Sequence, residues 1–282
     1  MARSTDISPL SKVLARADAV ADGAQSPDTI ATGFPSLDRM LGGGLRRGDL
    51  VVVGGDVGSG KSAFALAVAL RAAQQRLRVS FISGEMSTER VLERVLAIEG
   101  RVRVDDLRAG VPNDVARASV GAAAVRMRDG LPRFELLPPG GVPALAESLE
   151  DAKLDLVVVD SLQWLSTGTR AFDDDLADAV RRLKALAVEH HIALFVTSQL
   201  PNLGARDDKR PTLEDFGALG AVKHHADVVL ALFREDMYDR RREIEGATEL
   251  LVRKNRNGTT GYVDLYFYAQ WMRFEDMVDP DR

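Results

Sequence analysis

The segment Gly55-Asp-Val-Gly-Ser-Gly-Lys61-Ser62 follows the apolar run Leu50–Gly54 and leads into the alanine-rich stretch Ser62–Gln74. Its spacing fits G-x-x-x-x-G-K-[ST], and a strand before it with a helix after it is the context that this motif requires. Glycines let the chain curl so that backbone N–H groups converge on phosphate oxygens, which the N-terminus of the following helix also attracts. A glycine-rich turn with a chance lysine is the weaker alternative. The predicted phosphate-binding residues are Gly55, Asp56, Val57, Gly58, Ser59, Gly60, Lys61 and Ser62.

Two oxygen ligands for a metal ion are expected beside this loop. In such loops the lysine, here Lys61, reaches the β- and γ-phosphates, and the hydroxyl of Ser62 can ligate Mg²⁺. Asp160 ends the apolar run Leu154–Val159, which places its carboxylate at the carboxyl edge of the sheet, where ligands bind in open α/β folds. We expect Asp160 to complete the Mg²⁺ site, although a helix N-cap is an alternative role.

Two further polar residues follow predicted strands and belong to the same edge. Glu85 comes just after Val79–Ser83, where a carboxylate can orient or deprotonate an attacking water. It can equally cap the helix that starts near Ser87. Gln199 follows Ile192–Thr197 and can sense a γ-phosphate, or it can be an ordinary loop residue. The residues alone leave both choices open.

Composition sets the outer limits. The chain has 282 residues, 45% of them hydrophobic and 28% charged, which is the balance of a globular protein with one large or two small domains. It has no cysteine, which excludes disulfides, iron–sulfur clusters and thiol catalysis. The net charge of 37 − 42 = −5 means that a nucleic-acid role has to rest on local loops. No export signal or membrane-length apolar run is visible, so we expect a cytoplasmic protein without membrane contact.

Strand-like and helix-like segments alternate from Thr32 onward, and the tail is rich in strands. This predicts an α/β fold with a mostly parallel central sheet flanked by helices on both faces, and a strand-rich C-terminal extension. The expected strands are Leu50–Gly54, Arg78–Ser83, Arg133–Leu137, Leu154–Val159, Ile192–Thr197, Asp227–Leu232, Glu249–Arg253 and Tyr262–Phe267. The expected helices are Ser62–Gln74, Ser87–Glu99, pieces of Val104–Arg128 broken near Gly110-Val111-Pro112, and Asp174–His190; Pro138–Gly141 is expected to be a loop.

Residues 1–30 are expected to form a helix and a tether, and residues 31–282 to form the α/β domain. Leu10, Val13, Leu14, Ala17 and Val20 recur at helical spacing, which predicts an amphipathic helix of about three turns. Such a helix can fold back on its own domain or pack on a neighbouring molecule, and the sequence favours neither.

These pieces, in this order, resemble the ATPase domain of DnaB-type replicative helicases, which are RecA-like P-loop NTPases. The resemblance covers about residues 30–278. Its matching stretches are Thr32–Met40, Gly84–Ser87, Asp160–Gln163, Ser198–Leu200, Lys209–Pro211, Ala226-Asp227 and Lys254–Gly258. It implies a ring-forming ATPase, hexameric by family expectation, that uses ATP and Mg²⁺ to translocate 5′–3′ on single-stranded DNA and unwind duplex during DNA replication. A loader and a primase are the partners that it leaves unnamed.

The resemblance also implies roles for single residues. Glu85 matches the catalytic glutamate, and Gln199 matches the glutamine that couples nucleotide state to nearby loops. Lys254 and Arg256 match basic residues that reach the γ-phosphate bound by the adjacent subunit, and Arg94 matches an arginine near the base. The N-terminal helix looks like the linker helix that packs on a neighbour. Beside the resemblance, Asn257-Gly258 signals a hairpin whose tip can project Arg256 outward, with a solvated basic turn as the alternative.

The sequence departs from the family in a loop that faces the ring channel. Family members carry Arg-Glu-Ser-Gly after Asp-Leu, whereas this chain reads Asp215-Phe-Gly-Ala-Leu-Gly220. Each lost phosphate contact weakens DNA binding. The remaining candidates for DNA contact are Lys209, Arg210, Gly217, Gly220 and Lys223. Gly84 replaces a common leucine, and Ser161 replaces a common tyrosine. The altered loop, the acidic net charge and the presence of only about 30 residues before the core make a regulatory or assembly ATPase without motor activity the alternative function.

Overall fold

The computed structural model describes residues 8–23, 26–110, 113–128, 130–239 and 245–277. Its main sheet consists of β3 (Leu50–Gly55), β4 (Val79–Ser83), β5 (Arg133–Leu136), β6 (Leu156–Asp160), β7 (Ala193–Gln199), β8 (Val228–Phe233), β9 (Ala247–Asn255), β10 (Gly261–Tyr268) and β11 (Arg273–Asp276). The strand order is β11-β10-β9-β8-β3-β7-β6-β4-β5. The strands from β8 to β5 in this order are parallel, and β9, β10 and β11 pair antiparallel. A small second sheet pairs β1 (Thr29–Ile30) with β2 (Leu45–Arg46).

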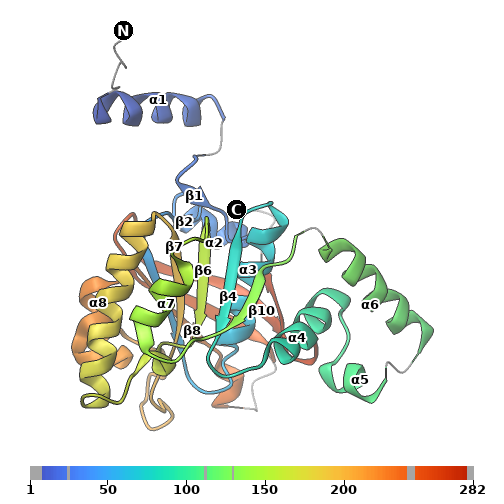
Figure 1. Ribbon diagram of the computed structural model, residues 1–282. Coiled ribbons are helices and arrows are strands. Elements are labelled where there is room, and N and C mark those ends of the chain that lie inside the picture. The colour runs from blue at the N-terminus through green and yellow to red at the C-terminus, as the bar shows by residue number, and fades with distance from the viewer. Residues whose placement is uncertain (1–7, 24–25, 111–112, 129, 240–244, 278–282) are drawn as a thin grey trace.

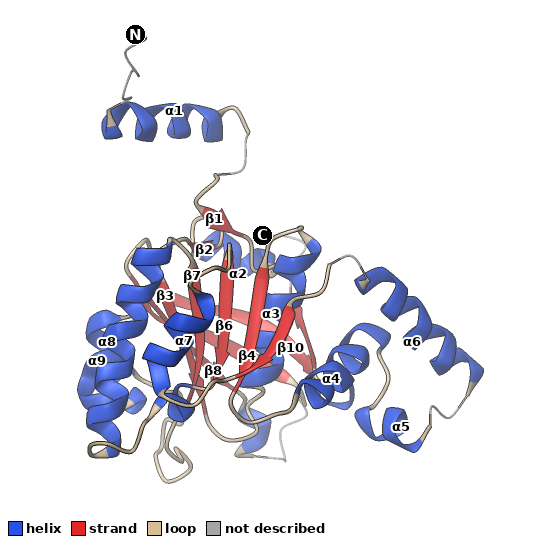
Figure 2. Cartoon of the chain, in the orientation of Figure 1, coloured by secondary structure: helices blue, strands red, loops and turns tan. Residues whose placement is uncertain are grey.

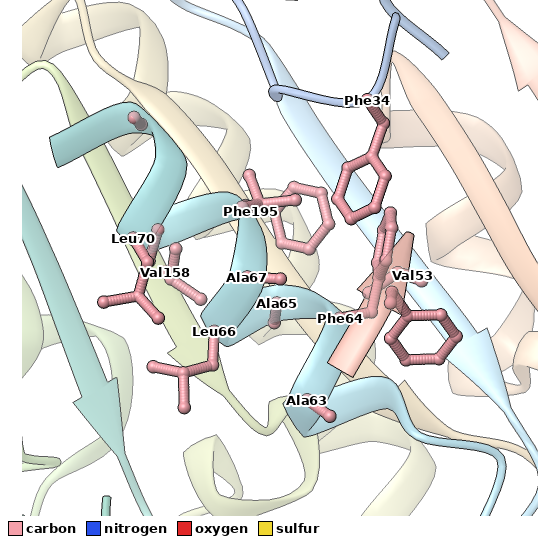
Figure 3. Packing of buried hydrophobic residues seen from close by; sticks show 14 of the residues in the cluster. Phe34, Val53, Ala63, Phe64, Ala65, Leu66, Ala67, Leu70, Val158 and Phe195 are labelled. Carbon is pink, nitrogen blue, oxygen red and sulfur yellow. The ribbon is translucent and has the colours of Figure 1, made fainter. Parts of the chain in front are cut away.

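Helices cover both faces of the main sheet (Figures 1 and 2). The helices of the described residues are α1 (Pro9–Ala21), α2 (Pro35–Met40), α3 (Lys61–Gln74), α4 (Thr88–Gly100), α5 (Val104–Ala109), α6 (Asp114–Met127), α7 (Gly141–Leu149), α8 (Phe172–His190) and α9 (Ala221–His225). One core lies between the sheet and α3, where alanines bring the helix close and Phe64 packs 5.0 Å from Phe34 and 6.2 Å from Phe195 (Figure 3). The other core packs α7, α8 and α9 on the opposite face. Within the described residues, no helix is both long and apolar enough to cross a membrane.

The predicted α/β fold, the mostly parallel sheet and the strand-rich extension are confirmed. The helical break also occurs between α5 and α6, although Val111 and Pro112 lie outside the described residues. The expected loop is present over residues 138–140, but helix α7, which begins at Gly141, was not predicted. Val142, Leu145 and Leu149 form its buried face, a helical spacing hidden by the glycines and the proline around them. Strand β11 was also not predicted.

Helix α1 stands away from the domain on its tether (Figure 1). The predicted helix is confirmed, and Ser8 caps it by accepting a hydrogen bond from the backbone N–H of Ser11 at 3.2 Å. Its apolar side chains Leu10, Val13 and Leu14 are between 49% and 67% exposed. The structure therefore does not realise the alternative in which this face folds back on its own domain.

Candidate functional site

The predicted nucleotide-binding residues converge at the carboxyl edge of the parallel strands. Strand register pairs Gly55 with Gln199 and Ser83 with Asp160, so the ends of β3, β7, β4 and β6 lie side by side. A cavity of about 480 Å³ opens at this edge, a volume typical of small-molecule sites. The predicted residues that line it are Val57, Gly58, Gly60, Lys61, Ser62, Glu85, Arg94, Asp160 and Gln199.

The phosphate loop has the backbone shape that its glycines predict. Gly60 adopts a left-handed conformation with φ 98° at the start of α3, and a Cβ there would lie 2.8 Å from the ring of Phe274. The ammonium of Lys61 donates hydrogen bonds to the carbonyls of Gly55 and Asp56, both at 2.9 Å. Burial lowers the pKa of Lys61, while nearby carboxylates, Asp160 foremost, act in the opposite direction. The loop thus holds a half-buried cation beside N–H groups at a helix N-terminus, an arrangement suited to an anion.

Three of the predicted loop residues serve the loop without lining the cavity. Ser59 is buried, and its hydroxyl lies 2.4 Å from where a Cβ on Gly55 would stand. The carboxylate of Asp56 accepts a hydrogen bond from the hydroxyl of Tyr238 at 3.0 Å. These residues hold the shape of the loop from outside.

Asp160 presents a buried carboxylate to the cavity. Its Oδ1 accepts a hydrogen bond from the hydroxyl of Thr197 at 2.5 Å. Its Oδ2 is buried and finds no hydrogen-bond partner in the described part of the chain. Burial raises the pKa of Asp160, and the hydroxyls of Thr197 and Ser62 oppose that shift. A buried oxygen without a partner, next to the Ser62 hydroxyl, suits a hard cation such as Mg²⁺.

Glu85, Gln199 and Arg94 approach the cavity from three separate elements. Glu85 is exposed in the turn after β4, and the hydroxyl of Ser161 donates to its Oε1 at 3.5 Å. Gln199 ends β7, and its backbone N–H donates to the side chain of Gln163 at 3.1 Å. Arg94 lies on α4, where burial lowers its pKa and the charge of Asp160 raises it. A carboxylate, an amide and a guanidinium therefore face one space.

Sequence reasoning missed part of the cavity wall, above all Arg234. This arginine follows β8 at the same edge, and its guanidinium donates to the carbonyl of Gly58 at 3.4 Å and to Asp236 at 2.8 Å. It also lies 4.8 Å from the ring centre of Phe267. The rule that found Asp160, a polar residue directly after an apolar strand, also fits Arg234. The other unpredicted lining residues are Ala63, Ser161, Phe267, Ala269 and Met272. The last three, near the end of β10 and in the turn that follows it, gave no sequence signal.

Lys254 and Arg256 lie at the opposite edge of the sheet from the phosphate loop. Strand β9 runs antiparallel to β8 and pairs Asn255 with Val228, which in turn pairs with Val51 near the start of β3. The ammonium of Lys254 donates to backbone carbonyls at the end of α9, those of Lys223 at 2.7 Å and Ala226 at 2.5 Å. Neither residue lines the cavity of its own chain. The loop between β9 and β10 holds residues 256–260, so the hairpin is present but longer than a two-residue turn.

The basic candidates for DNA contact have partners within the fold. Arg210 forms two hydrogen bonds with Glu249, at 2.7 and 2.6 Å, and Lys223 pairs with Glu214. Lys209 donates to the carbonyl of Arg206 at 3.0 Å. Gly217, with φ of 59°, precedes a short 3₁₀ segment (Ala218–Gly220), and Gly220, with φ of 78°, ends it. Leu219 within this segment is 67% exposed. The charge of this region is therefore largely compensated internally.

A family model described as DnaB-like helicase C terminal domain matches residues 29–276. The replicative DNA helicase DnaB of Geobacillus stearothermophilus is 32% identical over 261 residues, covering 88% of this chain and 56% of that protein. Its namesake from Haemophilus influenzae is 31% identical over 263 residues, covering 89% and 56%. The chain thus spans about half the length of the curated relatives it matches.

Solved structures agree on the fold. One of them, described as an ATPase domain, superposes with a TM-score of 0.88 at 23% identity, covering 97% of this chain and 100% of that one. A DnaB-like replicative helicase, described together with its interactions with primase, gives 0.86 at 24% identity, covering 97% and 68%.

Proposed function

The chain belongs to the family of DnaB-like helicase C-terminal domains, and from this premise we propose that it is the motor of a ring-forming DNA helicase. In this proposal ATP is hydrolysed at the interfaces between subunits, and the energy drives 5′–3′ movement on single-stranded DNA and duplex unwinding during replication. Residues 1–30 act as the linker helix and tether, and residues 31–282 as the ATPase domain. A hexamer is the proposed ring, and a primase or a loader is the proposed partner.

Mg-ATP fits the residues of the cavity. Lys61 exchanges its two carbonyl acceptors for the β- and γ-phosphates, which the N–H groups of the loop also bind. Ser62 and the unpartnered Oδ2 of Asp160 would hold Mg²⁺, which neutralises the charge that develops on the phosphates. Arg94 belongs to α4 and lines the same cavity, and it is proposed to contact the base of the nucleotide.

Hydrolysis needs a base and a sensor in the same space. Glu85 is proposed to accept the proton of the water that attacks the γ-phosphorus, as the bond to the β-phosphate oxygen breaks and ADP leaves. Its exposure and its weak contact with Ser161 leave it able to approach a water. Gln199 is proposed to report the state of the γ-phosphate, because it continues directly into the segment that holds Lys209 and Arg210.

The observation that carries the proposal is the separation of two halves of one site. Arg256 and Lys254 lie at the amino end of β3, and the phosphate loop lies at its carboxyl end. Strand β3 spans five residue steps, which is about 17 Å at a rise of ~3.3 Å per residue. Arg256 therefore does not reach the cavity of its own chain, and we propose that a head-to-tail ring brings it to the cavity of the next subunit.

Mixing two inactive variants tests this separation. Lys61→Ala destroys the cradle and Arg256→Ala destroys the proposed arginine finger, so each alone should lose ATPase activity by about 10³-fold or more. In rings assembled from equal parts of both variants, each interface has an intact cradle in about half of cases and an intact arginine in about half. Roughly a quarter of the head-to-tail interfaces therefore contain both. We expect ATPase activity to recover to about that fraction. No recovery in confirmed mixed rings would overturn the assignment of Arg256 to the neighbouring site.

A second candidate function is a regulatory or assembly ATPase that no longer moves on DNA. The observation that favours it is the pairing of Arg210 with Glu249 and of Lys223 with Glu214, which leaves little net positive charge for a phosphate backbone. ATPase activity measured with and without a single-stranded oligonucleotide separates the two. Stimulation together with 5′–3′ unwinding supports the motor, and ATP turnover indifferent to DNA supports the regulator.

A further inference from the structure

A cluster of polar and charged residues lies at the amino edge of the sheet, around the start of β3. It comprises Asp227, which is 1% exposed, together with Asp49, Lys184 and Asn257, and it lies beside Arg256. The chemistry proposed for the nucleotide cavity uses none of these four residues. We call them the arginine dock.

Asp227 is fixed on one side by groups that cannot move far. Its Oδ2 accepts hydrogen bonds from the ammonium of Lys184 at 2.6 Å and from the backbone N–H of Leu50 at 2.9 Å. Its own N–H donates to the carbonyl of Leu50 at 2.8 Å. A buried carboxylate is costly unless it is paired, and Lys184 with Leu50 already supply that pairing.

The other carboxylate oxygen of Asp227 faces Arg256. Nη1 of Arg256 lies 2.9 Å from Oδ1, an ion pair in which Oδ1 accepts no hydrogen bond from the described residues. The backbone N–H of Arg256 donates to the carbonyl of Asp227, also at 2.9 Å. The arginine side chain nevertheless remains 53% exposed. A guanidinium has five N–H donors in a rigid fork, so one edge can rest on a carboxylate while the other meets a phosphate.

A second tie fixes the next residue of the loop. The side-chain amide of Asn257 donates to Asp49 at 2.6 Å. Burial and the charge of Asp227 raise the pKa of Asp49, while Asn257 and Lys184 act in the opposite direction. The tip of the hairpin is thus held at two residues. Asp227, just before β8, holds Arg256, and Asp49, just before β3, holds Asn257.

We propose that Asp227 is a positioning residue that presents the Arg256 guanidinium to the nucleotide cavity of the adjacent subunit, with the Asn257–Asp49 contact as its second support. The inference rests on the proposed function, because it assumes that Arg256 acts on the neighbouring site. Prepositioning lowers the cost of ordering a long side chain when the phosphate arrives. A role confined to folding would instead need only the contacts with Lys184 and Leu50.

Asp227→Asn keeps the shape and one acceptor oxygen but removes the negative charge that pairs with both Arg256 and Lys184. We expect kcat to fall about 10–100-fold, as misplacement of a reacting group by ~1 Å does, with KM for ATP changed less than about threefold because the cradle is untouched. The matched control is Asp155→Asn. Asp155 is also a buried carboxylate at the amino edge, paired with Arg47 at 2.9 Å, but it has no contact with Arg256. This control should keep kcat within about threefold.

Subunit mixing gives a readout that a purely structural role does not produce. Rings that mix Asp227→Asn with Lys61→Ala should recover activity. Rings that mix Asp227→Asn with Arg256→Ala should not, because these two variants both impair the side of the interface that supplies Arg256. If Asp227→Asn does not assemble, the exposed Asn257→Ala takes its place, with a smaller loss of kcat and the same pattern. Recovery with Arg256→Ala, or equal losses in Asp227→Asn and Asp155→Asn, would overturn the positioning role. Failure of the Lys61→Ala and Arg256→Ala pair alone would instead overturn the proposed function.

Discussion

Replacing Gly54 with alanine should push the ring of Phe216 out of its place in the core. A Cβ on Gly54 would lie 2.6 and 2.7 Å from Cε1 and Cζ of Phe216, and 3.0 Å from Cδ2 of Leu200. Carbon atoms in contact stay about 3.5–4.0 Å apart, so the ring has to retreat by about 1 Å. Phe216 is 4% and Leu200 is 3% exposed, so neither has open space to enter. The substitution therefore strains the joint between β3 and the loop of residues 213–220.

The cost follows from packing. Overpacking of this kind destabilises by about 1–3 kcal/mol. Phe216→Leu removes the two offending ring atoms and by itself should cost about 1 kcal/mol in lost packing. In the double variant the alanine methyl group fills the space that the ring has left. We expect the double variant to be about as stable as Phe216→Leu alone, a coupling of about 1–3 kcal/mol between the two sites.

The assay is the free energy of unfolding in urea for the four proteins of this cycle. Gly121→Ala is the matched control, because Gly121 lies within α6 and a Cβ there has no neighbour within 4 Å among the described atoms. It should stabilise by about 0.5–1 kcal/mol through helix propensity. If the effects of Gly54→Ala and Phe216→Leu add to within about 0.5 kcal/mol, the argument from the ring contact is refuted.

Three further outcomes are expected. Arg234→Gln should weaken nucleotide binding by about tenfold or more through loss of a charged donor at the cavity, measured by titration with a fluorescent nucleotide. Tyr238→Phe should lose about 1 kcal/mol with the hydrogen bond to Asp56. Burial and Asp56 raise the pKa of Tyr238 to about 12, above about 10 when unfolded, so this loss should be full below pH 10 and shrink toward pH 12 in urea unfolding. The pKa of Asp155 is lowered, because its contacts with Arg78 and Arg47 outweigh the opposing effect of burial. The native chain should therefore be more stable than Asp155→Asn above about pH 4, and this difference should disappear in acid.

The nucleotide cavity was largely predictable, and the reason is topological. Asp160 and Gln199 end apolar strands and Glu85 stands two residues beyond one, and parallel strands bring such positions to a single edge whatever their distance in sequence. Asp160, Glu85 and Gln199 were found this way. Arg234 obeys the same rule but was overlooked, because a basic residue before Glu235-Asp236 reads as part of a solvated charged turn.

The partners of the basic residues were not predictable. Arg210 meets Glu249 across 39 positions of sequence, and only the antiparallel extension of the sheet brings them together. Lys254 looked like a second free cation beside Arg256, yet it binds the carbonyl oxygens at the end of α9. Whether a lysine is free or engaged depends on contacts that local spacing does not encode.

Departures from the family pattern become intelligible as matched pairs. A Cβ at Gly84 would lie 2.6 Å from Cβ and Cγ of Trp164, so the tryptophan after β6 fills the space in which a leucine side chain would stand. Phe216, which belongs to the altered loop, packs in the same manner against Gly54, where a Cβ would lie 2.6 Å from its ring. These two glycines therefore accommodate the large side chains that approach the carboxyl edge.

In the proposed function, the position of β3 limits how ATP hydrolysis can produce movement. Its carboxyl end bears the phosphate loop, and its amino end is bonded to Asp227 and through it to Arg256. Every residue of this strand is buried, and neighbours flank it on both sides. Closely packed interiors deform little, so the distance between a subunit's own cradle and its own arginine stays nearly constant through the cycle. In the proposed ring, binding and release of the γ-phosphate would therefore change the angle between subunits, with Arg256 withdrawing from the neighbouring cavity as a rigid part of its own sheet.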